Sequence, residues 1–332
     1  MDEHKGNSRY RSHSRFMDTA VKIIPVSAVV PTANRSVVLQ ITLESVAQQS
    51  VQPAEIIIID ASEDELTMQL CAKSIPGLSS VIRYEKAKQK GAASQRNQAV
   101  DIALNDVIFF IDDDIRMQEA CVERIWTCLQ SDNNIGAVNA MIINQRYHSP
   151  GKVTRFMYRV LSGVNLRSYA GKCIGPAWNL LPEDDESLPE CNQVEWLNTT
   201  CTMYKKQALP FPVFQSHFKG YSLLEDVALS LTVGKKWKLF NARTARIYHD
   251  SQPGTHKNSV YQLSKMELIN RHYVMRHVLN RAGFVNYCKL FLFEAFGIFS
   301  TATSVSGIKN ILPNSFGKLA AFVTLLFTKT SS

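Results

Sequence analysis

Four consecutive isoleucines, Ile56 to Ile59, constrain the fold of this chain more than any other feature of its sequence. They stand between Glu55 and Asp60. Isoleucine is β-branched and favours strands, and an apolar run without alternating polar residues is typical of a strand covered on both faces. Strands of this kind lie at the centre of parallel sheets with helices on both sides, so the run predicts an α/β fold.

Predicted strands and helices alternate up to about residue 115. Strands are predicted at 27–30, 55–60, 81–84 and 107–111, and helices at 36–46, 63–74 and 91–104. Pro31 is expected to end the first strand because it lacks a backbone donor, and Ser36 is expected to cap the first helix. This alternation implies a parallel, doubly wound sheet, in which ligands bind beyond the carboxyl ends of the strands.

The pattern changes after residue 114. We expect a helix at 117–130, a strand at 135–143, an irregular segment rich in Gly, Pro and Ser at 145–191, and ordered structure at 194–204. Another helix is expected to begin at Glu225, followed by strand pieces at 237–240 and 246–249. From residue 260 the sequence is helical and basic, and from residue 290 it is strongly apolar. The second part is therefore expected to depart from simple alternation.

Three consecutive aspartates, Asp112 to Asp114, follow directly after the fourth predicted strand. Adjacent carboxylates repel one another, and a divalent cation removes the repulsion because hard cations prefer carboxylate oxygen. Asp112 and Asp114 can reach one ion if the turn curls. The alternative is a polar turn that caps the next helix, since aspartate also favours N-caps.

Glu225-Asp226 and His249 are the other candidates for chemistry. The acidic pair lies after Lys219-Gly220-Tyr221-Ser222 and opens a predicted helix. Acidic residues at a helix start are also ordinary partners of the helix dipole. His249 can be a metal ligand through a neutral imidazole, although a lone histidine is more often a surface or core residue. Neither feature is decisive by itself.

Positive charge is concentrated in the last third of the chain. The net charge is +8, and residues 235–289 contain eleven Lys and Arg but only Asp250 and Glu267 as acids, so 11 − 2 gives +9. Such a surface suits phosphates, anionic lipid or nucleic acid, and a solvated basic face is the alternative. No nucleic-acid-binding motif or interleaving of aromatic and basic residues appears, so nucleic acid is not an expected partner.

Cysteine usage and the first residues indicate the compartment. The seven cysteines are odd in number and include no C-x-x-C pair, so free thiols in a reducing compartment are expected rather than a zinc site or disulfide framework. Residues 1–22 are polar and basic and lack the apolar core of a secretory signal. The first turn, residues 31–34, has no glycine, which argues against a nicotinamide-dependent dehydrogenase.

A series of loose motifs, taken in order, resembles the family 2 glycosyltransferases with the GT-A fold. The matching segments are Val29–Arg35, Leu43–Val46 with Gln49, Glu55–Asp60, Gly91–Asn97, Phe110–Asp114, Val194–Leu197, Met203–Lys206, Gly220-Tyr221, Leu224–Val227 and His249. They cover about Val26 to Pro253. The conjunction is specific although each motif is loose. It implies a Rossmann-like, mostly parallel sheet, a second half that binds the acceptor, and a C-terminal helical region.

The resemblance also implies roles for individual residues. Contacts to a UDP-, GDP- or dTDP-sugar donor are expected from Pro31, Thr32, Asp60, Arg96, Asp112 and Asp113. Mg²⁺ or Mn²⁺ is expected on Asp112, Asp114 and His249. Asp226 is the expected general base, with Glu225 beside it as the other member of the catalytic pair. Trp196 and Leu197 are expected to contact the acceptor.

The chain departs from the family pattern at four places. Asn198 to Cys201 follow Trp-Leu where the family has glycine and a small residue, and Lys205-Lys206 replace paired arginines. Ala228 stands where a further acid is common, and Ala61-Ser62 follow Asp60 in place of an acidic residue and glycine. Acceptor contacts are therefore less well defined than donor contacts, and the donor base stays open.

Four segments follow from this pattern: a flexible basic tail at 1–25, a nucleotide-sugar-binding half at 26–116, an acceptor-binding and catalytic half at 117–257, and C-terminal helices at 258–332. Apolar stretches around 290–299 and 311–327 are interrupted by Glu294 and Pro313. Helices lying on the inner face of the cell membrane are the preferred interpretation, with Lys289, Lys309 and Lys318 near the headgroups. Packing on the catalytic part and spanning the bilayer are the alternatives.

The function expected from the sequence is inverting transfer of a sugar from a nucleotide-diphosphate sugar to an acceptor hydroxyl. Assembly of a surface polysaccharide or glycolipid is the expected setting, with a glycan or lipid-linked acceptor and a cytoplasmic enzyme peripheral on the membrane. The alternative is a degenerate protein of the same fold that binds a nucleotide sugar or glycan without turnover. Intact acids at Asp112, Asp114 and Asp226 argue against that alternative.

Overall fold

A mixed α/β architecture is built around one large sheet in the computed structural model, which describes residues 21–251, 259–301 and 305–327. The sheet consists of β1 (Lys22–Thr32), β2 (Val51–Asp60), β3 (Val81–Lys86), β4 (Val107–Ile111), β5 (Ile115–Met117), β6 (Ile135–Ile142), β9 (Cys191–Val194), β10 (Cys201–Lys205) and β11 (Lys238–His249). A small hairpin joins β7 (Cys173–Ile174) and β8 (Trp178–Asn179).

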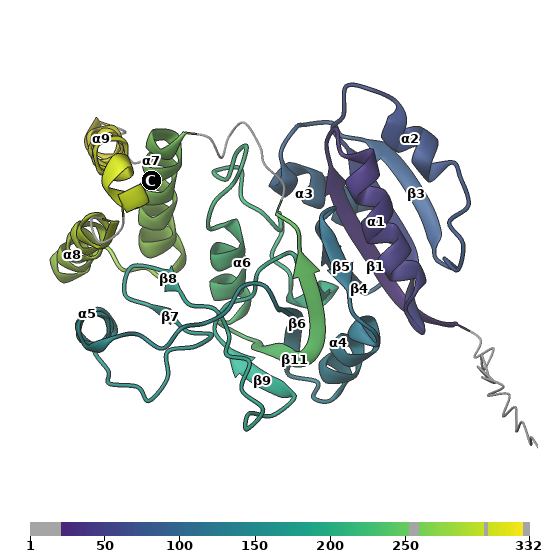
Figure 1. Cartoon of the computed structure of the whole chain (residues 1–332), viewed down its shortest axis with the longest axis horizontal. Coiled ribbons are helices and arrows are strands. Elements are labelled where there is room, and N and C mark those ends of the chain that lie inside the picture. Colours follow the sequence, from purple (N-terminus) through teal and green to yellow (C-terminus); the bar gives the residue numbers. More distant parts are fainter. Residues whose placement is uncertain (1–20, 252–258, 302–304, 328–332) are drawn as a thin grey trace, which may run out of the picture.

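Helices pack against the sheet, and a further group of helices lies at one end of the molecule (Figure 1). The helices are α1 (Ser36–Ala47), α2 (Leu66–Cys71), α3 (Ala92–Ile102), α4 (Cys121–Gln130), α5 (Lys152–Ser162), α6 (Glu225–Val233), α7 (Val260–Tyr273), α8 (Phe284–Thr301) and α9 (Val305–Phe327). A π-helical turn, Val274–Val278, continues α7. In Figure 1, α5, α8 and α9 gather at the end of the molecule opposite α1, α2 and β3.

The sheet is mostly parallel, as the sequence predicts. Its order is β3-β2-β1-β4-β10-β6-β11-β5, with β9 paired to β11. Strands β3, β2, β1 and β4 are parallel neighbours, and β6 is parallel to β11. Strand β10 lies antiparallel between β4 and β6, and β5 and β9 are antiparallel to β11. This order places the carboxyl ends of β1, β4 and β11 along one edge.

Alternate residues of the central strands pack against different helices. In β2, Ile56 and Ile58 join one core that includes α1 and α4, whereas Ile57 and Ile59 join another that includes α3 and α6. All four isoleucines are completely buried. The apolar run therefore reflects a strand covered on both faces, and the expected doubly wound arrangement is confirmed for this part of the sheet.

Strand β1 is longer than predicted. It begins at Lys22, within the segment expected to be a tail, and it continues through Pro31. The register with β4 ends at Val29, so beyond that point the strand follows β2 alone and tolerates proline there. Residues 1–20 of the expected tail lie outside the described residues. Ser36 is the first residue of α1 rather than its cap.

The segment predicted to be irregular, 145–191, contains α5 and the β7–β8 hairpin. The prediction was wrong because glycine, proline and serine flank α5 and conceal an 11-residue helix. The expected boundary at residue 116 falls inside β5, which pairs with β11, so the donor and acceptor halves share one sheet. That division of roles stays a proposal.

Charged side chains hold α7, α8 and α9 together. The buried guanidinium of Arg271 on α7 bonds the carbonyl oxygen of Ala177 at 2.7 Å and contacts Glu267 at 2.6 Å and Glu294 of α8 at 3.3 Å. Lys318 of α9 is paired with both carboxylates. Glu294 therefore ties α8 to its neighbours, and the expected place of Lys318 near lipid headgroups is wrong, since its side chain is only 11% exposed.

Pro313 lies inside α9 without ending the helix, contrary to the interruption expected from the sequence. Among the described helices, none has the length and apolar character needed to cross a membrane.

The expectation that all cysteines are free thiols is wrong for one pair. Cys128 of α4 and Cys191 of β9 form a disulfide, with Cα atoms 6.0 Å apart and a sequence separation of 63. Helix α4 packs beside β11, and β9 pairs with β11, which brings the two cysteines together. Cys71, Cys121, Cys173, Cys201 and Cys288 are free.

Candidate active site

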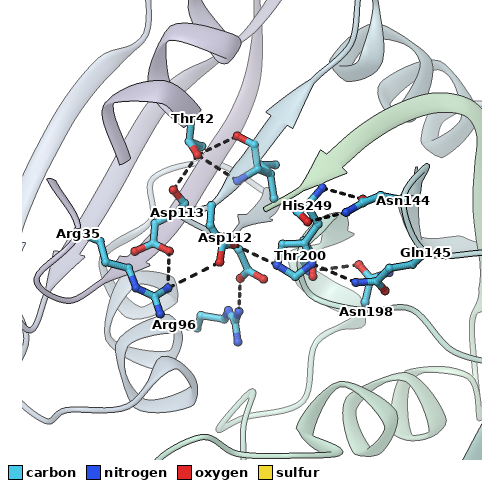
Figure 2. Close-up of polar contacts among 12 residues, drawn as sticks. Arg35, Thr42, Arg96, Asp112, Asp113, Asn144, Gln145, Asn198, Thr200 and His249 are labelled. Carbon is cyan, nitrogen blue, oxygen red and sulfur yellow. Dashed lines mark hydrogen bonds and ion pairs between the residues drawn. The ribbon is translucent and has the colours of Figure 1, made fainter. Parts of the chain in front are cut away.

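The three aspartates form a tight turn at the carboxyl end of β4, and two of them, Asp112 and Asp113, are labelled in Figure 2. The hydroxyl of Thr42, on α1, donates to the carbonyl oxygens of Asp113 and Ile115 at 2.8 and 2.9 Å and accepts from the Ile115 amide at 3.2 Å. The Asp112 amide donates to the carbonyl of Thr200 at 2.9 Å. The turn is thus held from two sides. Its backbone curls, as it must if Asp112 and Asp114 are to reach one ion.

Asp113 is bonded toward β1 and Arg35, and the same Arg35 nitrogen lies 3.7 Å from the carboxylate of Asp114. The Asp113 carboxylate accepts from the Thr32 hydroxyl at 2.7 Å and from Arg35 at 3.2 Å. Burial raises the pKa of Asp113 to about 6, while the bond from Thr32 and the charge of Arg35 act in the opposite direction. Thr32 and Asp113, two of the six residues expected to bind the donor, are therefore bonded to each other in the structure. Their donor contacts stay a prediction.

Asp112, Asp114 and His249 form a possible metal site. One ligand atom from each lies within 4.8 Å of the others, and His249 Nε2 is 3.1 Å from Asp114. Two ligands of one Mg²⁺ at about 2.1 Å are at most about 4.2 Å apart, so small side-chain rotations suffice to bind an ion. Carboxylate oxygens suit Mg²⁺ and Mn²⁺, and the imidazole offers a nitrogen ligand beside them. The three residues named from the sequence therefore converge as expected.

Asn144 and Gln145, just beyond β6, fix the position of His249 (Figure 2). The Asn144 side chain accepts from the His249 amide at 3.1 Å and donates to its carbonyl at 2.8 Å. The Gln145 amide nitrogen lies 3.3 Å from His249 Nδ1. The ladder between β6 and β11 ends at Ile142 and Ile247, so Asn144 extends that pairing with its side chain. Sequence reasoning missed both residues.

Arg96 joins the aspartate turn to α6. Its guanidinium contacts Asp112 and Glu225, each at 2.5 Å, and only 4% of its side chain is exposed. Burial raises the pKa of Glu225 to about 7 against the lowering influence of Arg96. Arg96 was expected to meet the donor. In the structure it neutralises carboxylates from two different elements.

Asp226 lies in the first turn of α6, half-buried, and its carboxylate accepts from the Val227 amide at 2.8 Å. Burial raises the pKa of Asp226 to about 6, and the nearby Asp112 adds to the increase. In the segment that leads into α6, Ser222 and Leu224 have positive φ angles of 57° and 67°. Such strained backbone persists where the surroundings over-determine it, often at functional sites.

Tyr221 faces the same carboxylates. Burial raises its pKa, and the charges of Asp112, Asp114, Asp226 and Glu225 raise it further. The Tyr221 phenol is therefore close enough to these carboxylates for their charges to act on it. The Gly220-Tyr221 motif indicated this segment, but spacing alone gave the tyrosine no role.

Asp60 is completely buried at the end of β2. One carboxylate oxygen accepts from the Ser62 amide at 2.8 Å and from its hydroxyl, and the other accepts from Tyr84 at 2.9 Å. Lys86 is 3.5 Å away. Pro31 is buried in β1, opposite Ile59 of β2. Contacts of Asp60 and Pro31 with a donor base stay a prediction, and the Asp60 carboxylate already accepts three hydrogen bonds.

Trp196 and Leu197 lie in the core. The indole N–H of Trp196 donates to the carbonyl of Leu180 at 2.6 Å, and its ring packs with Phe218 and Val227. Leu197 is completely buried, and its amide is bonded to the Ser230 hydroxyl. Burial leaves these side chains little surface for an acceptor, and their expected acceptor contact stays a prediction that the structure does not favour.

A match of residues 27–209, more than half of the 332-residue chain, to glycosyl transferase family 2 now identifies the protein class. The chain belongs to this family. The match begins in β1 and ends after β10, so it includes the turn with Asp112 to Asp114. Asp226 and His249 lie beyond it.

Curated relatives match shorter stretches. An uncharacterized glycosyltransferase from Haemophilus influenzae is 32% identical over 114 residues, which are 34% of this chain and 37% of that protein. A PGL/p-HBAD biosynthesis glycosyltransferase from Mycobacterium bovis is 26% identical over 94 residues, 28% of this chain and 37% of that protein. The matched stretches thus span little more than a third of either relative.

Solved structures share the fold. A mannosyltransferase from Pyrobaculum calidifontis in complex with GDP-Man and Mn²⁺ has a TM-score of 0.53 at 13% identity, covering 94% of this chain and 89% of that one. GalNAc-T7 with UDP, GalNAc and Mn²⁺ has a TM-score of 0.50 at 14% identity, covering 76% of this chain and 50% of that one. The predicted GT-A fold is confirmed.

Proposed function

We propose that this protein transfers a sugar from a nucleotide-diphosphate sugar to an acceptor hydroxyl, with inversion at the anomeric carbon. The convergence of Asp112, Asp114 and His249 at the carboxyl end of β4 carries the proposal. These residues come from distant parts of the chain, and Asp112 is linked through Arg96 to the acidic pair of α6. Family membership and neighbours bound to GDP-Man, or to UDP and GalNAc, support a nucleotide-sugar donor.

The metal position fits the leaving group. When bound at Asp112, Asp114 and His249, Mg²⁺ or Mn²⁺ would neutralise charge on the nucleoside diphosphate as a Lewis acid. Strand β2 ends at Asp60, and β1 ends at Pro31 and Thr32, on the same sheet edge as the aspartate turn. A donor lying along that edge would place its diphosphate at the metal and its base toward β2. UDP-, GDP- and dTDP-sugars are the candidates.

Asp226 is the best placed base. Its carboxylate lies in the first turn of α6, close enough to Asp112 and Arg96 for their charges to shift its pKa. A pKa near 6 leaves Asp226 ionised at neutral pH yet basic enough to accept a hydroxyl proton. One base and one displacement need no enzyme nucleophile, and attack opposite the departing diphosphate inverts the anomeric centre. Glu225, held by Arg96, keeps the segment in place.

The proposed acceptor is a glycan or lipid-linked hydroxyl, used in surface polysaccharide or glycolipid assembly by a cytoplasmic enzyme at the inner face of the cell membrane. The mycobacterial relatives' role in PGL/p-HBAD biosynthesis supports a glycolipid setting. The basic excess of residues 235–289 supports an anionic partner surface.

Two measurements test this function. Thermal unfolding with UDP-, GDP- and dTDP-sugars should show that one donor raises the melting temperature with Mn²⁺ and not with chelator, because a ligand that binds the folded state stabilises it by mass action. The same donor should then be consumed, with release of nucleoside diphosphate. No stabilisation by any of these donors would overturn the proposal. Stabilisation without turnover on any acceptor would favour the degenerate binding protein.

A further inference from the structure

The outward face of α9 is largely apolar: of its two lysines, Lys309 is exposed near the start of the helix and Lys318 points inward. The exposed residues Ile308, Leu312, Phe316, Leu319, Val323 and Leu326 recur at spacings of three and four, so they share one face of the helix. Lys318, in contrast, is turned toward Glu267 and Glu294. A helix that packs on a protein and otherwise faces water has the opposite pattern. The outward face of α9 is therefore suited to an apolar environment.

Helices α8 and α5 have the same property. On α8 the exposed residues include Phe284, Phe291, Leu292 and Phe299, which follow one face. On α5 the exposed residues are Val153, Phe156 and Val160, and Val164 continues the stripe just beyond the helix. The opposite side of α5, with Met157 and Leu161, is buried. Three helices thus present apolar stripes to solvent.

Helix α8 contacts both α5 and α9, and the three helices lie at one end of the molecule (Figure 1). Lys289 of α8 donates to the carbonyl of Leu161 in α5 at 2.9 Å, and Lys318 of α9 is paired with Glu294 of α8. Contiguous exposed apolar surface of this extent marks an interaction site. We call the exposed apolar residues of these three helices the apolar end.

The charge around the apolar end is positive. Residues 144–182, which precede the acidic run Glu183 to Glu186, contain no acidic residue, and their basic residues are Arg146, Lys152, Arg155, Arg159, Arg167 and Lys172, of which Lys172 is paired with Glu195. In residues 259–327 the acids are Glu267 and Glu294, and both are paired with Arg271 and Lys318. Two copies meeting through this end would bring like charges together. An anionic surface is the complementary partner.

We infer that α5, α8 and α9 form a single docking face for an anionic lipid surface, with the apolar stripes at the acyl boundary and the basic residues at the headgroups. This arrangement is that of interfacial helices with aromatic and aliphatic anchors and a basic rim. Helix α5 was not among the helices expected at the membrane from the sequence. It lies between β6 and β7, so its contact with lipid would fix how the catalytic part is oriented on the surface. The inference rests on the proposed function only in that a lipid-linked acceptor gives docking its purpose.

Vesicle binding of the full chain tests the inference. The protein should sediment with phosphatidylcholine vesicles that contain phosphatidylglycerol and much less with phosphatidylcholine alone. Phe156→Glu on α5 and Phe316→Glu on α9 should each weaken partitioning about tenfold or more, since each removes a large apolar anchor and adds a repelled charge. Leu104→Glu, at an exposed residue between α3 and β4, is the matched control and should partition like the unchanged protein.

Cys288 supplies a second readout. It is exposed and lies on α8 one turn from Phe284 and Phe291. An environment-sensitive fluorophore at Cys288 should shift to the blue on vesicle addition, and Cys288→Ser gives the background. Binding is measured without donor or metal, so its outcome is independent of turnover.

Three results would overturn the inference. They are a protein that stays in the supernatant with anionic vesicles, an α5 variant that partitions like the unchanged protein, and a Cys288 probe that does not respond. Sedimentation velocity without lipid distinguishes the competing partner. A dimer that Phe316→Glu dissociates, in a protein that ignores vesicles, would show that a second copy covers the apolar end.

Discussion

Arg96 should be among the most costly residues of this protein to remove. Its guanidinium lies between Asp112 and Glu225, 2.5 Å from each, and the three side chains are 4%, 22% and 10% exposed. Arg96→Met retains much of the apolar stem and leaves two carboxylates without their cation. Because these groups are shielded from water, solvent replaces the lost interaction only in part.

The expected loss follows from the charges. Two unit charges about 4 Å apart attract by about 4 kcal/mol at an effective dielectric constant of 20. Breaking a buried pair by removing one partner typically costs about 3–5 kcal/mol, and the partial exposure of Asp112 favours the lower part of that range. The double variant with Glu225→Gln should recover part of the loss, because it removes one of the stranded carboxylates. The two changes should therefore be clearly non-additive.

Urea unfolding of the metal-free protein measures both effects. With a slope of about 3 kcal/mol per molar urea, the midpoint of Arg96→Met should fall by about 1 M. Lys238→Met is the matched control, because Lys238 lies 2.9 Å from Asp132 and both side chains are largely exposed. Exposed pairs contribute at most about 1 kcal/mol, so its midpoint should hardly move. Equal shifts for both variants, or additive effects of the two site changes, would refute the reasoning.

Further predictions concern the metal and the base. Asp114→Asn should abolish Mn²⁺ binding in calorimetry with the fold preserved, and unchanged affinity would exclude the proposed site. Asn144→Ala should weaken Mn²⁺ binding about 10- to 100-fold through loss of its two bonds to His249, with Asn134→Ala as a control. Asp226→Asn should lower kcat about 10²- to 10⁴-fold while product affinity survives, and equal loss of affinity would indicate a structural role instead. Because the pKa of Asp226 is raised from 3.8 to about 6, its ionisation opposes folding, so its contribution lowers the free energy of unfolding as pH rises from about 4 to about 6. Denaturation of the metal-free protein across that range should show a flatter pH dependence for Asp226→Asn than for the unchanged chain.

The sequence predicted the central strands well because their environment is simple. Strand β4 has the predicted bounds, and β2 contains the predicted run, since each is apolar on both sides. The expected convergence of Asp112, Asp114 and His249 also follows from strand order, because β5 and β11 bring the turn and the histidine together. These features could be predicted because they depend on local apolar runs and on the order of strands along the chain.

Features that depend on a distant partner were not predictable. Thr42 bonds the aspartate turn across more than 70 residues, and Asn144 bonds His249 across 105 residues in sequence. Lys318 was assigned to the outer face of α9, yet the position of Glu294 on a neighbouring helix determines which way it turns. Helix α5 was missed because its flanking residues resemble a loop. In each case the deciding neighbour lies far away in the sequence.

Strand β10 has a consequence for the order in which the protein can be assembled during synthesis. It lies between β4 and β6, so residues 107–111 and 135–142 cannot be joined into one sheet until residues 201–205 have left the ribosome. Until then the nascent chain carries open edges on β4 and β6, and unpaired strand edges invite association with other chains. Long-range pairing of this kind also slows folding. A nascent chain that ends before Cys201 should therefore depend on chaperones far more than one that extends past Lys205.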